Sequence, residues 1–383
     1  MIRDCFERAI EEMVREDLAV GRIACAEVLV GDRDGVKFHR QFPGEGETMK
    51  IAPDSLFRMA SMTKPVVGVC VMKQVERGLL SLDDEIYHYL PMMKDPMVGE
   101  FSAEFELTGT HPSPRQITVR DLLTHTSGLG SGMWFFTRCD KASIRDGMRL
   151  EDMMPEYAET PLEFDPGTAF SYSPLAGFDV LARLVEITSG LSIESFARKY
   201  VFDPLGMQDT TFAPTPEQMA RVVRIHAEQH GKAVPVNMPP TVFESIPATY
   251  FTGGGGLISG GVDYAQFARM LLREGECDGA HILLPETVRL MRTAQLDPAV
   301  VRGIDETQSW GLSMRVITAD NGSGKPLDKG AYGWSGAYGT HFWVDPVRDL
   351  FAVYLSNMTT AGGAGAITAR RIEAVVMDEF ARA

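Results

Sequence analysis

Apolar residues near the start of the chain first repeat with a helical period and then form two short runs. Residues three or four positions apart predict an amphipathic helix; they are Phe6, Ile10, Met13, Val14 and Leu18. The two runs, at 23–30 and 36–40, are separated by the turn sequence Gly-Asp-Arg-Asp-Gly. Short apolar runs on either side of a glycine-containing turn predict a β-hairpin.

The far end of the chain carries similar elements. Apolar runs at 310–317, 341–344 and 350–355 predict three strands, and a closing helix is expected from about Ile367. A turn at 345–349 joins the last two strands. Tight turns between neighbouring strands imply antiparallel pairing. We therefore expect both chain ends to contribute to one antiparallel sheet.

The middle of the chain carries helical signals instead. Asp263 and Gln266 form a possible capping box, and the Thr-Pro pair at 215–216 is typical of a helix start. The helices expected from these signals and from the 3.6-residue period are 118–123, 175–187, 215–225 and 265–273.

These elements predict an α+β fold with two lobes. One lobe is the antiparallel sheet with its flanking helices, and the other is a mainly helical insertion. We expect the first lobe to comprise 1–84 and 245–383, and the inserted domain to comprise 85–244. A cleft is expected where the two lobes meet.

The composition argues against two classes of partner. The 383 residues include 37 Lys and Arg against 52 Asp and Glu, a net charge of −15 at pH 7, and the few lysines are scattered. Binding to a phosphate backbone needs a basic stripe, which this chain lacks. The longest strictly apolar stretch, 65–72, is far shorter than the roughly 20 residues of a membrane-spanning helix. Neither nucleic acid nor a membrane is expected as a partner.

The N-terminus and the cysteines favour a cytoplasmic location. Charged residues crowd positions 1–18, where a secretory signal would carry an apolar core. The five cysteines include no Cys-x-x-Cys pair, which is typical of reduced, structural thiols. The oligomeric state is left open by these patterns.

One short pattern combines a nucleophile with a base. Ser61-Met62-Thr63-Lys64 directly precedes the apolar run 66–72, so Ser61 and Lys64 are expected on one face at the start of a helix. The helix N-terminus and burial both disfavour the charged form of Lys64, and a neutral lysine can accept the serine proton. A Ser-x-x-Lys match also arises by chance, so the pattern alone leaves a purely structural interpretation equally open.

A tyrosine stands at the entrance to the helix expected at 175–187. Tyr172 lies in the sequence Phe-Ser-Tyr-Ser-Pro, and near a lysine its pKa can be lowered enough to relay protons to a leaving group. Tyr172 can equally be an ordinary packing residue. Taken in isolation, packing is the stronger interpretation.

A glycine-rich segment, 333–340, leads into the strand expected at 341–344. Glycines let the backbone approach a ligand closely, and a free N–H group there can stabilise an oxyanion. A simple turn between strands is the commoner explanation. A catalytic role for this segment is favoured only when other catalytic motifs are present in the same chain.

Metal and nucleotide sites are not expected. His226 and His230 are four residues apart, but Glu228 does not fit the order of a zinc protease, so we expect a solvated helix face. The segment 322–326 resembles a phosphate loop but has proline where Ser or Thr must bind magnesium. No metal and no cofactor are therefore predicted.

Together, three motifs resemble those of the serine β-lactamase and penicillin-binding superfamily. They are Ser-Met-Thr-Lys at 61–64, Tyr-Ser-Pro at 172–174 and Trp-Ser-Gly at 334–336. The resemblance extends from about Ile23 to Asn357, and it is greatest to the family VIII carboxylesterases, relatives of the class C β-lactamases. Supporting stretches lie at 122–129, 204–207, 209–212 and 254–257.

The resemblance implies a two-lobed β-lactamase-like fold and a role for each motif. Ser61 would be the acylated nucleophile and Lys64 its base. Tyr172 would move the proton to the leaving group and help to deprotonate the hydrolytic water. The backbone N–H groups of Ser61 and Ala337 would form the oxyanion hole, in which one donor is worth about 3 kcal/mol.

Two departures from the family pattern indicate the substrate class. Penicillin-recognising enzymes usually carry Tyr-x-Asn and Lys-Thr-Gly, whereas this chain has Pro174 and Trp334 at the corresponding places. Without those polar anchors a site binds a carboxylate weakly, and an indole favours uncharged apolar groups. Small neutral esters are therefore expected as substrates, bound along Trp334, Ser335 and Gly336.

A second set of aromatic residues is expected near the substrate. Trp134 and Phe135 align with a cleft-lining loop of the family and are expected to add an apolar wall, although an aromatic run is more often part of a core.

The residues predict a cytoplasmic serine carboxylesterase that acts on short-chain neutral esters through a covalent acyl-enzyme. A β-lactamase or a D-amino-acid peptidase or amidase is one alternative, and an acyltransferase to an alcohol or amine is another. A catalytically silent binding protein with the same fold is the third. Loss of Ser61, Lys64 or Tyr172 would favour the silent binding protein, but all three residues are present.

Overall fold

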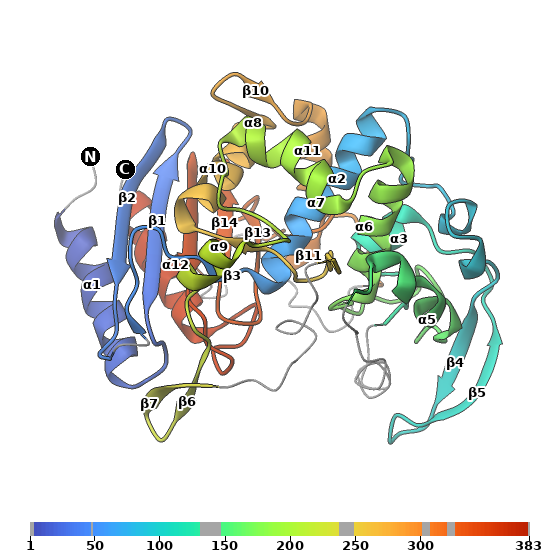
Figure 1. Cartoon of the computed structure of the whole chain (residues 1–383), viewed down its shortest axis with the longest axis horizontal. Coiled ribbons are helices and arrows are strands. Elements are labelled where there is room, and N and C mark those ends of the chain that lie inside the picture. Colours follow the sequence, from blue (N-terminus) through green and yellow to red (C-terminus); the bar gives the residue numbers. More distant parts are fainter. Residues whose placement is uncertain are drawn as a thin grey trace.

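The computed structural model describes residues 4–46, 49–130, 147–236, 249–300, 307–319 and 326–381. Figure 1 shows a β-sheet beside both chain ends and a mainly helical part on the other side of the molecule. This arrangement confirms the predicted two-lobed α+β fold. Trp134 and Phe135 lie outside the described residues. The boundaries at residues 84 and 245 stay a prediction.

An antiparallel sheet of seven strands joins the two ends of the chain. Its order is β11-β12-β13-β14-β15-β1-β2, so the N-terminal hairpin β1–β2 pairs with the last strand, and Val28 lies opposite Tyr354. The predicted shared sheet is confirmed. The bounds are β1 Ala26–Asp32, β2 Gly35–Phe42, β11 Gln308–Trp310, β12 Arg315–Ile317, β13 Tyr332–Ser335, β14 His341–Asp345 and β15 Leu350–Leu355.

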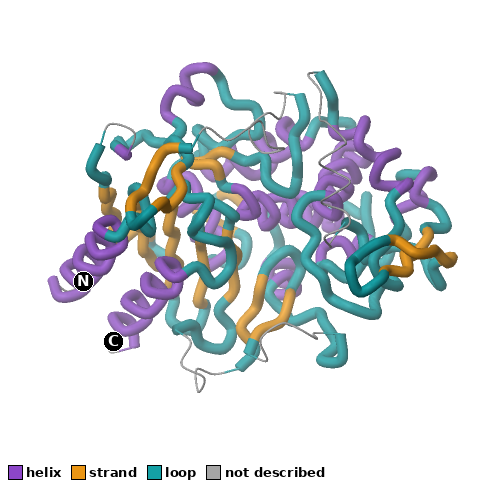
Figure 2. The backbone as a smooth tube through the Cα atoms, turned by 90° about the horizontal axis from the view of Figure 1, so that it is seen from below, coloured by secondary structure: helices purple, strands orange, loops and turns teal. Residues whose placement is uncertain are grey.

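Helices cover both faces of this sheet. Val28 and Val30 of β1 belong to the same apolar cluster as α1 (Asp4–Ala19) and α12 (Ile367–Ala381). Figure 2 shows these two helices side by side next to the sheet. Leu29, between the two valines, belongs to the larger cluster that includes α10, Gly261–Leu272. The alternation along β1 follows from the two-residue period of a strand.

The helical part is built around α2, Thr63–Glu76, which packs against α6 and α7. Nearly all of α2 is buried, which explains why apolar residues surround the helix on every side. The other helices are α3 Val119–Leu123, α5 Met154–Glu159, α6 Ala176–Ser189, α7 Ile193–Ala197, α8 Asp203–Leu205, α9 Pro216–Arg221 and α11 Pro285–Met291. Single 3₁₀ turns and one π-helical turn are η2 Ala60–Met62, η3 Ile86–His88, η4 Pro91–Met93, η5 Leu150–Met153 and η6 Arg198–Phe202.

Four short strand pairs complete the described fold. Figure 1 shows β4–β5 at the end of the molecule farthest from the chain termini, and β6–β7 as a separate hairpin. The pairs are β3 Phe57–Arg58 with β8 Ile258–Ser259, β4 Met97–Phe101 with β5 Leu107–Pro112, β6 His226–Gln229 with β7 Lys232–Pro235, and β9 Glu276–Cys277 with β10 Ala280–His281.

Three details of the predicted elements are wrong. The helix expected to reach Ile225 ends at Arg221, and the chain enters β6 at His226, which is buried, so this histidine lies on a strand and not on a solvated helix face. The single strand expected at 310–317 is two strands, because the chain turns back at Ser313, where φ is +74°.

The third difference concerns the start of α10. The helix begins at Gly261, and Asp263 forms no capping box. Its carboxylate instead accepts hydrogen bonds from the backbone N–H of Asp209 at 2.8 Å and from Thr210 Oγ1 at 3.0 Å. Asp263, which the sequence suggested as a helix cap, therefore forms a long-range contact between α10 and the loop after α8.

No helix among the described residues is both long enough and apolar enough to cross a membrane. The four described cysteines, Cys5, Cys25, Cys70 and Cys277, are free thiols, and Cys139 lies outside the described residues. Burial raises the pKa of Cys25 to about 12, so this thiol stays protonated and inert.

A buried carboxylate connects the two terminal helices. Asp17 at the end of α1 is completely buried and accepts a hydrogen bond from Thr368 Oγ1 at 2.6 Å. Arg22 and Arg371 donate to its other oxygen. Two guanidinium groups and a hydroxyl thus compensate the loss of water around this carboxylate.

We expect Asp17→Ala to lower the free energy of unfolding by about 3 kcal/mol, because the substitution leaves Arg371 and Thr368 without their buried acceptor. Chemical unfolding would measure the loss. Glu16→Ala is the matched control, since Glu16 contacts Arg371 from an exposed position and should matter by less than about 1 kcal/mol. Equal losses in the two variants would contradict this account.

Candidate active site

Ser61 stands in the turn η2, between β3 and the buried helix α2. Ala60, just before it, has φ +46°, a left-handed conformation that costs a non-glycine residue about 1–3 kcal/mol. This turn leaves Ser61 half-buried, while Ala60 and Met62 on either side are buried. The backbone therefore bends so that one hydroxyl reaches the surface of the core.

Lys64 is fully buried one helical turn after Ser61, and its amino group touches three oxygens. Nζ lies 3.1 Å from Ser61 Oγ, 2.6 Å from the carbonyl oxygen of Pro174 and 2.8 Å from the carbonyl oxygen of Gly254. A neutral amine has two hydrogens and one lone pair. When the two carbonyls take both hydrogens, the lone pair faces the Ser61 hydroxyl.

The glycine at 254 is required by this arrangement. A Cβ atom on Gly254 would lie 2.6 Å from the Pro174 carbonyl oxygen, closer than real Cβ atoms approach. A side chain would therefore separate the two carbonyls that hold Lys64. Gly254, which begins the stretch 254–257 that supports the family resemblance, is therefore needed for a steric reason.

The surroundings of Lys64 favour its uncharged form. Burial lowers the pKa of Lys64 to about 7, and the negative charge of Asp179 works against this shift. An amine with a pKa near neutrality can both accept and return a proton under ordinary conditions. The predicted disfavouring of charged Lys64 by burial is consistent with this pKa.

Tyr172 completes the group of side chains around Ser61. Its hydroxyl is hydrogen-bonded to Ser61 and accepts a hydrogen bond from Trp334 Nε1 at 3.1 Å. Lys64 Nζ lies 4.9 Å from the centre of the Tyr172 ring. The structure thus brings together Ser61, Lys64, Tyr172 and Trp334, which come from three distant motifs.

The pKa of Tyr172 differs from the prediction. Loss of solvent raises the pKa of this phenol above its usual value, and the hydrogen bonds from Ser61 and Trp334 only partly oppose the rise. The sequence-based expectation of a lowered pKa is therefore wrong. Tyr172 is a phenol that keeps its proton at neutral pH.

The segment after β13 lies directly against the turn that carries Ser61. A Cβ atom on Gly336 would lie 2.3 Å from the carbonyl oxygen of Met59 and 3.3 Å from the Cβ atom of Ala60. Thr340 Oγ1 also donates to the Met59 carbonyl oxygen at 3.1 Å. Ala337, the next residue after Gly336, is exposed. The proposed oxyanion-hole residues therefore belong to two segments in contact.

Ser335 has a different environment from its neighbours. Its buried hydroxyl is 2.8 Å from His341 Nδ1, and His341 Nε2 is 2.9 Å from Glu373 Oε1. This chain of contacts joins β13, β14 and α12. The hydroxyl of Ser335 thus takes part in packing the sheet onto the terminal helix, whereas the half-buried indole of Trp334 faces Tyr172.

Asp179 is a buried charge that sequence analysis missed. Tyr157 and Tyr250 each donate a hydroxyl to its Oδ2 at 2.7 Å, Thr252 Oγ1 donates to Oδ1 at 2.6 Å, and the Gly254 N–H donates at 3.3 Å. Burial raises the pKa of Asp179, and these bonds oppose the rise. Four donors around one carboxylate favour its ionised form.

The Asp179 network touches the reacting groups through Gly254. The N–H of Gly254 bonds to Asp179 while its carbonyl oxygen accepts from Lys64 Nζ. Asp179 lies within the first turns of α6, so its position in the sequence resembles that of any helical polar residue. The special role of Asp179 becomes visible only from its hydrogen-bond partners in distant segments. No local sequence pattern predicts those partners.

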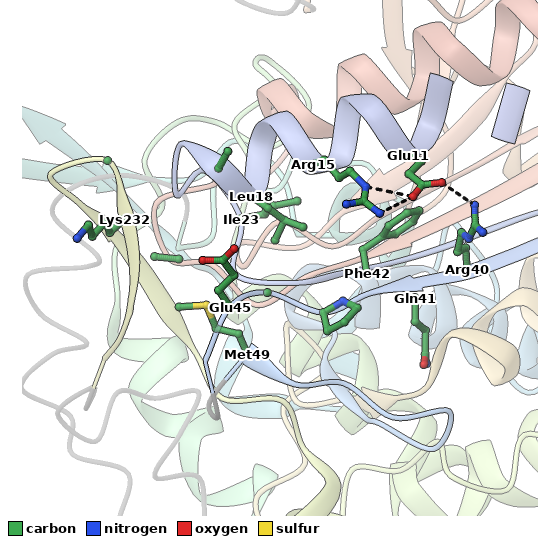
Figure 3. A pocket seen from close by; sticks show the side chains of 15 residues that line it. Glu11, Arg15, Leu18, Ile23, Arg40, Gln41, Phe42, Glu45, Met49 and Lys232 are labelled. Atoms are coloured by element: carbon green, nitrogen blue, oxygen red, sulfur yellow. Dashed lines mark hydrogen bonds and ion pairs between the residues drawn. The ribbon is translucent and has the colours of Figure 1, made fainter. Parts of the chain in front are cut away.

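A groove of about 980 Å³ lies elsewhere on the molecule (Figure 3). It runs between α1, the end of β2 and the turn of the β6–β7 hairpin, and Leu18 and Phe42 line it. Glu11 pairs with both Arg15 and Arg40, so much of the charge in the groove is balanced internally. Neither the Ser61 cluster nor the Asp179 network contributes to it.

Comparison with known proteins identifies the class to which this site belongs. The β-lactamase family model matches residues 10–377, and the chain therefore belongs to the β-lactamase family. It is a serine hydrolase of the β-lactamase-like kind, with esterases among its relatives.

Two relatives and one solved structure illustrate this relationship. The chain is 36% identical to protein Rv1367c of Mycobacterium tuberculosis, over 79% of this chain and 77% of that protein. It is 30% identical to esterase EstB of Burkholderia gladioli, over 96% of this chain and 94% of the esterase. The structure of EstCE1, a hydrolase with promiscuous acyltransferase activity, superposes with a TM-score of 0.80 at 22% identity and covers 97% of this chain and 98% of its own. This last likeness shows the shared fold.

The pH dependence of activity tests the state of Lys64. We expect kcat/KM for an ester to rise with pH through a midpoint near the Lys64 pKa of about 7 and to level off above it, because only the uncharged amine accepts a proton. Lys64→Arg keeps its charge and should lower kcat/KM by about 10³-fold. The control is Lys73→Arg on the same helix, whose amine donates to the Ile282 carbonyl and pairs with the Glu76 carboxylate. A Lys64→Arg enzyme as active as this control would refute the assignment.

Replacing the buried carboxylate tests its influence on Lys64. Asp179→Asn removes the negative charge that favours the ammonium form, so the acidic limb of the pH–rate profile should move to lower pH. Tyr157→Phe removes one hydrogen bond to Asp179 and keeps the charge. It should lower the unfolding free energy by about 1 kcal/mol and move the limb much less. A shift to higher pH in Asp179→Asn would speak against this coupling.

Proposed function

We propose that this protein is a serine carboxylesterase that hydrolyses short-chain neutral esters through a covalent acyl-enzyme on Ser61. The observation that carries the proposal is the contact between a buried amine, whose pKa is lowered to about 7, and a serine hydroxyl, with Lys64 Nζ 3.1 Å from Ser61 Oγ. A hydroxyl is a weak nucleophile until a base removes its proton. Lys64 is the base in this proposal.

Acylation follows from the positions of these groups. Ser61 Oγ attacks the ester carbonyl carbon while its proton passes to Lys64. The backbone N–H groups of Ser61 and Ala337 would stabilise the oxyanion, as the contact between their segments supports. The C–O bond to the alcohol then breaks, and Tyr172, a phenol hydrogen-bonded to Ser61, delivers the proton that the alkoxide takes up. Lys64 returns its proton to Tyr172.

Deacylation repeats the sequence with water as the nucleophile. Water replaces the alcohol, loses its proton to the Tyr172 and Lys64 pair, and attacks the acyl carbon. The bond between the acyl group and Ser61 Oγ breaks, and Ser61 regains a proton. The raised pKa of Tyr172 and the lowered pKa of Lys64 favour Lys64 as the resting base of this pair.

The surroundings of Tyr172 support an uncharged ester as the substrate. Penicillin-recognising relatives place a lysine where this chain has Trp334, and the indole N–H here is already bonded to Tyr172. Trp310 lies edge-on to Trp334, with ring centres 4.5 Å apart. An apolar wall of this kind favours an alkyl or acyl chain over a carboxylate. The likeness to EstB adds support for an ester substrate.

Acyl transfer to an alcohol or amine is a second outcome of the same chemistry, since an acyl-enzyme reacts with whichever nucleophile reaches it. The likeness to EstCE1, a hydrolase with promiscuous acyltransferase activity, favours testing it. We also propose a cytoplasmic location, which the free thiols of the described cysteines support. The substrate is a small molecule, and no macromolecular partner is proposed.

Intact mass spectrometry and steady-state kinetics test the proposal together. A phosphonate ester should add one adduct per wild-type chain, mapped to Ser61, and none to Ser61→Ala. Acetyl and butyryl p-nitrophenyl esters should have kcat/KM values at least about 100-fold above that of a chromogenic cephalosporin. Product analysis with an added alcohol distinguishes hydrolysis from acyl transfer.

Ser195→Ala, which changes an exposed serine of α7, is the matched control and should label like the wild type. An adduct on Ser61→Ala would sink the nucleophile assignment. A preference for the cephalosporin would replace the esterase by a β-lactamase, and an unreactive wild-type chain would favour a silent binding protein.

A further inference from the structure

His125 is a buried histidine beside Tyr172 that the mechanism above does not use. It follows α3 and is 1% exposed, and its ring centre lies 4.5 Å from that of Tyr172. Its backbone has φ +58°, a left-handed conformation that is uncommon outside glycine. A buried imidazole in an unusual backbone conformation calls for a specific role.

His125 forms hydrogen bonds with the residues immediately before and after Tyr172 in the sequence. The backbone N–H of Ser171 donates to the His125 carbonyl oxygen at 3.0 Å. The backbone N–H of Ser173 donates to His125 Nδ1, also at 3.0 Å. One residue thus holds the amides immediately before and after Tyr172, and its ring packs against the phenol itself.

These contacts fix the chemical state of the imidazole. Because Nδ1 accepts a hydrogen bond, the proton of a neutral ring must be on Nε2. Nε2 is buried and has no hydrogen-bond partner among the described residues. The ring is instead surrounded by aromatic side chains, with Trp310 edge-on at 4.9 Å and Phe178 at 5.4 Å. Burial, together with the nearby charge of Lys64, holds the pKa of His125 well below its usual value, which keeps Nδ1 an acceptor.

His125 itself is held by a rigid support. The carbonyl oxygen of Leu123, at the end of α3, accepts hydrogen bonds from Trp310 Nε1 and from the backbone N–H of Ser313, both at 3.0 Å. At the other end of α3, Thr118 and Asp121 form a capping box. A short helix fixed at both ends gives His125 a fixed position relative to the sheet.

We propose that His125 is the positioning residue for Tyr172, holding the flanking amides so that the phenol stays between Ser61 and the leaving group. This inference rests on the proposed esterase mechanism and deepens it. Small displacements of a proton donor from its acceptor have large effects on rate. Without the two amide contacts, the loop at 171–173 would no longer fix the Tyr172 hydroxyl beside Ser61.

The leaving group of the substrate separates positioning from simple stability. p-Nitrophenolate departs without a proton, whereas the alkoxide of an ethyl ester needs one from Tyr172. Misplacement of Tyr172 should therefore slow ethyl butyrate far more than p-nitrophenyl butyrate. Partial unfolding would instead lower the active fraction, which phosphonate titration measures, and would affect both esters equally.

Two amide substitutions imitate different parts of the imidazole. His125→Asn keeps an acceptor near the place of Nδ1 and tolerates the left-handed backbone. His125→Gln carries its amide farther out and lacks that acceptor. Per active site, we expect His125→Gln to lose about 100-fold in kcat/KM on ethyl butyrate and less than about tenfold on p-nitrophenyl butyrate. His125→Asn should stay within about threefold of wild type on both esters.

Controls keep this inference separate from the proposed function. His226→Gln removes another buried imidazole, on β6, and should behave as wild type. Tyr172→Phe should show the same dependence on leaving group as His125→Gln, and its absence would overturn the role given to Tyr172. Equal losses of His125→Gln on the two esters, or equal behaviour of the Asn and Gln variants, would overturn the positioning role alone. A wild-type chain that cleaves neither ester would overturn both.

Discussion

The burial of one amino group is the constraint on which this site depends. A charged ammonium without water is unfavourable, so Lys64 is held near the point at which it gives up its proton. Two carbonyl oxygens satisfy its hydrogens and fix the direction of its lone pair. In the proposed mechanism the serine needs no separate histidine, because the desolvated amine at 3.1 Å is the base.

Two opposing influences keep the pKa of Lys64 near neutrality. Burial alone would drive Lys64 further towards its neutral form, and Asp179 opposes that by its charge. Tyrosine and threonine hydroxyls from other segments donate hydrogen bonds to this carboxylate and favour its ionised form. The site is thus a balance of one buried base, one buried anion and a phenol whose own pKa is raised.

The sequence predicted much of this architecture and part of its chemistry. The last strand, Leu350–Leu355, and the final helix from Ile367 were predicted because their apolar periods are strong and local. Ser61 and Lys64 were found because their contact spans one helical turn. Asp179 was missed, since its partners lie up to 75 residues away and leave no local pattern. The predicted low pKa of Tyr172 failed because a sequence does not show how far water is excluded from a hydroxyl.

The two carbonyls that orient Lys64 lie 110 and 190 residues further along the chain. A chain in which the segments around Pro174 and Gly254 have not yet folded therefore lacks both of these contacts to Lys64. In the proposed mechanism, hydrolytic competence arises only when residues spread over most of the polypeptide have been assembled around that amine. In the proposed mechanism, an incomplete molecule therefore cannot form the acyl-enzyme.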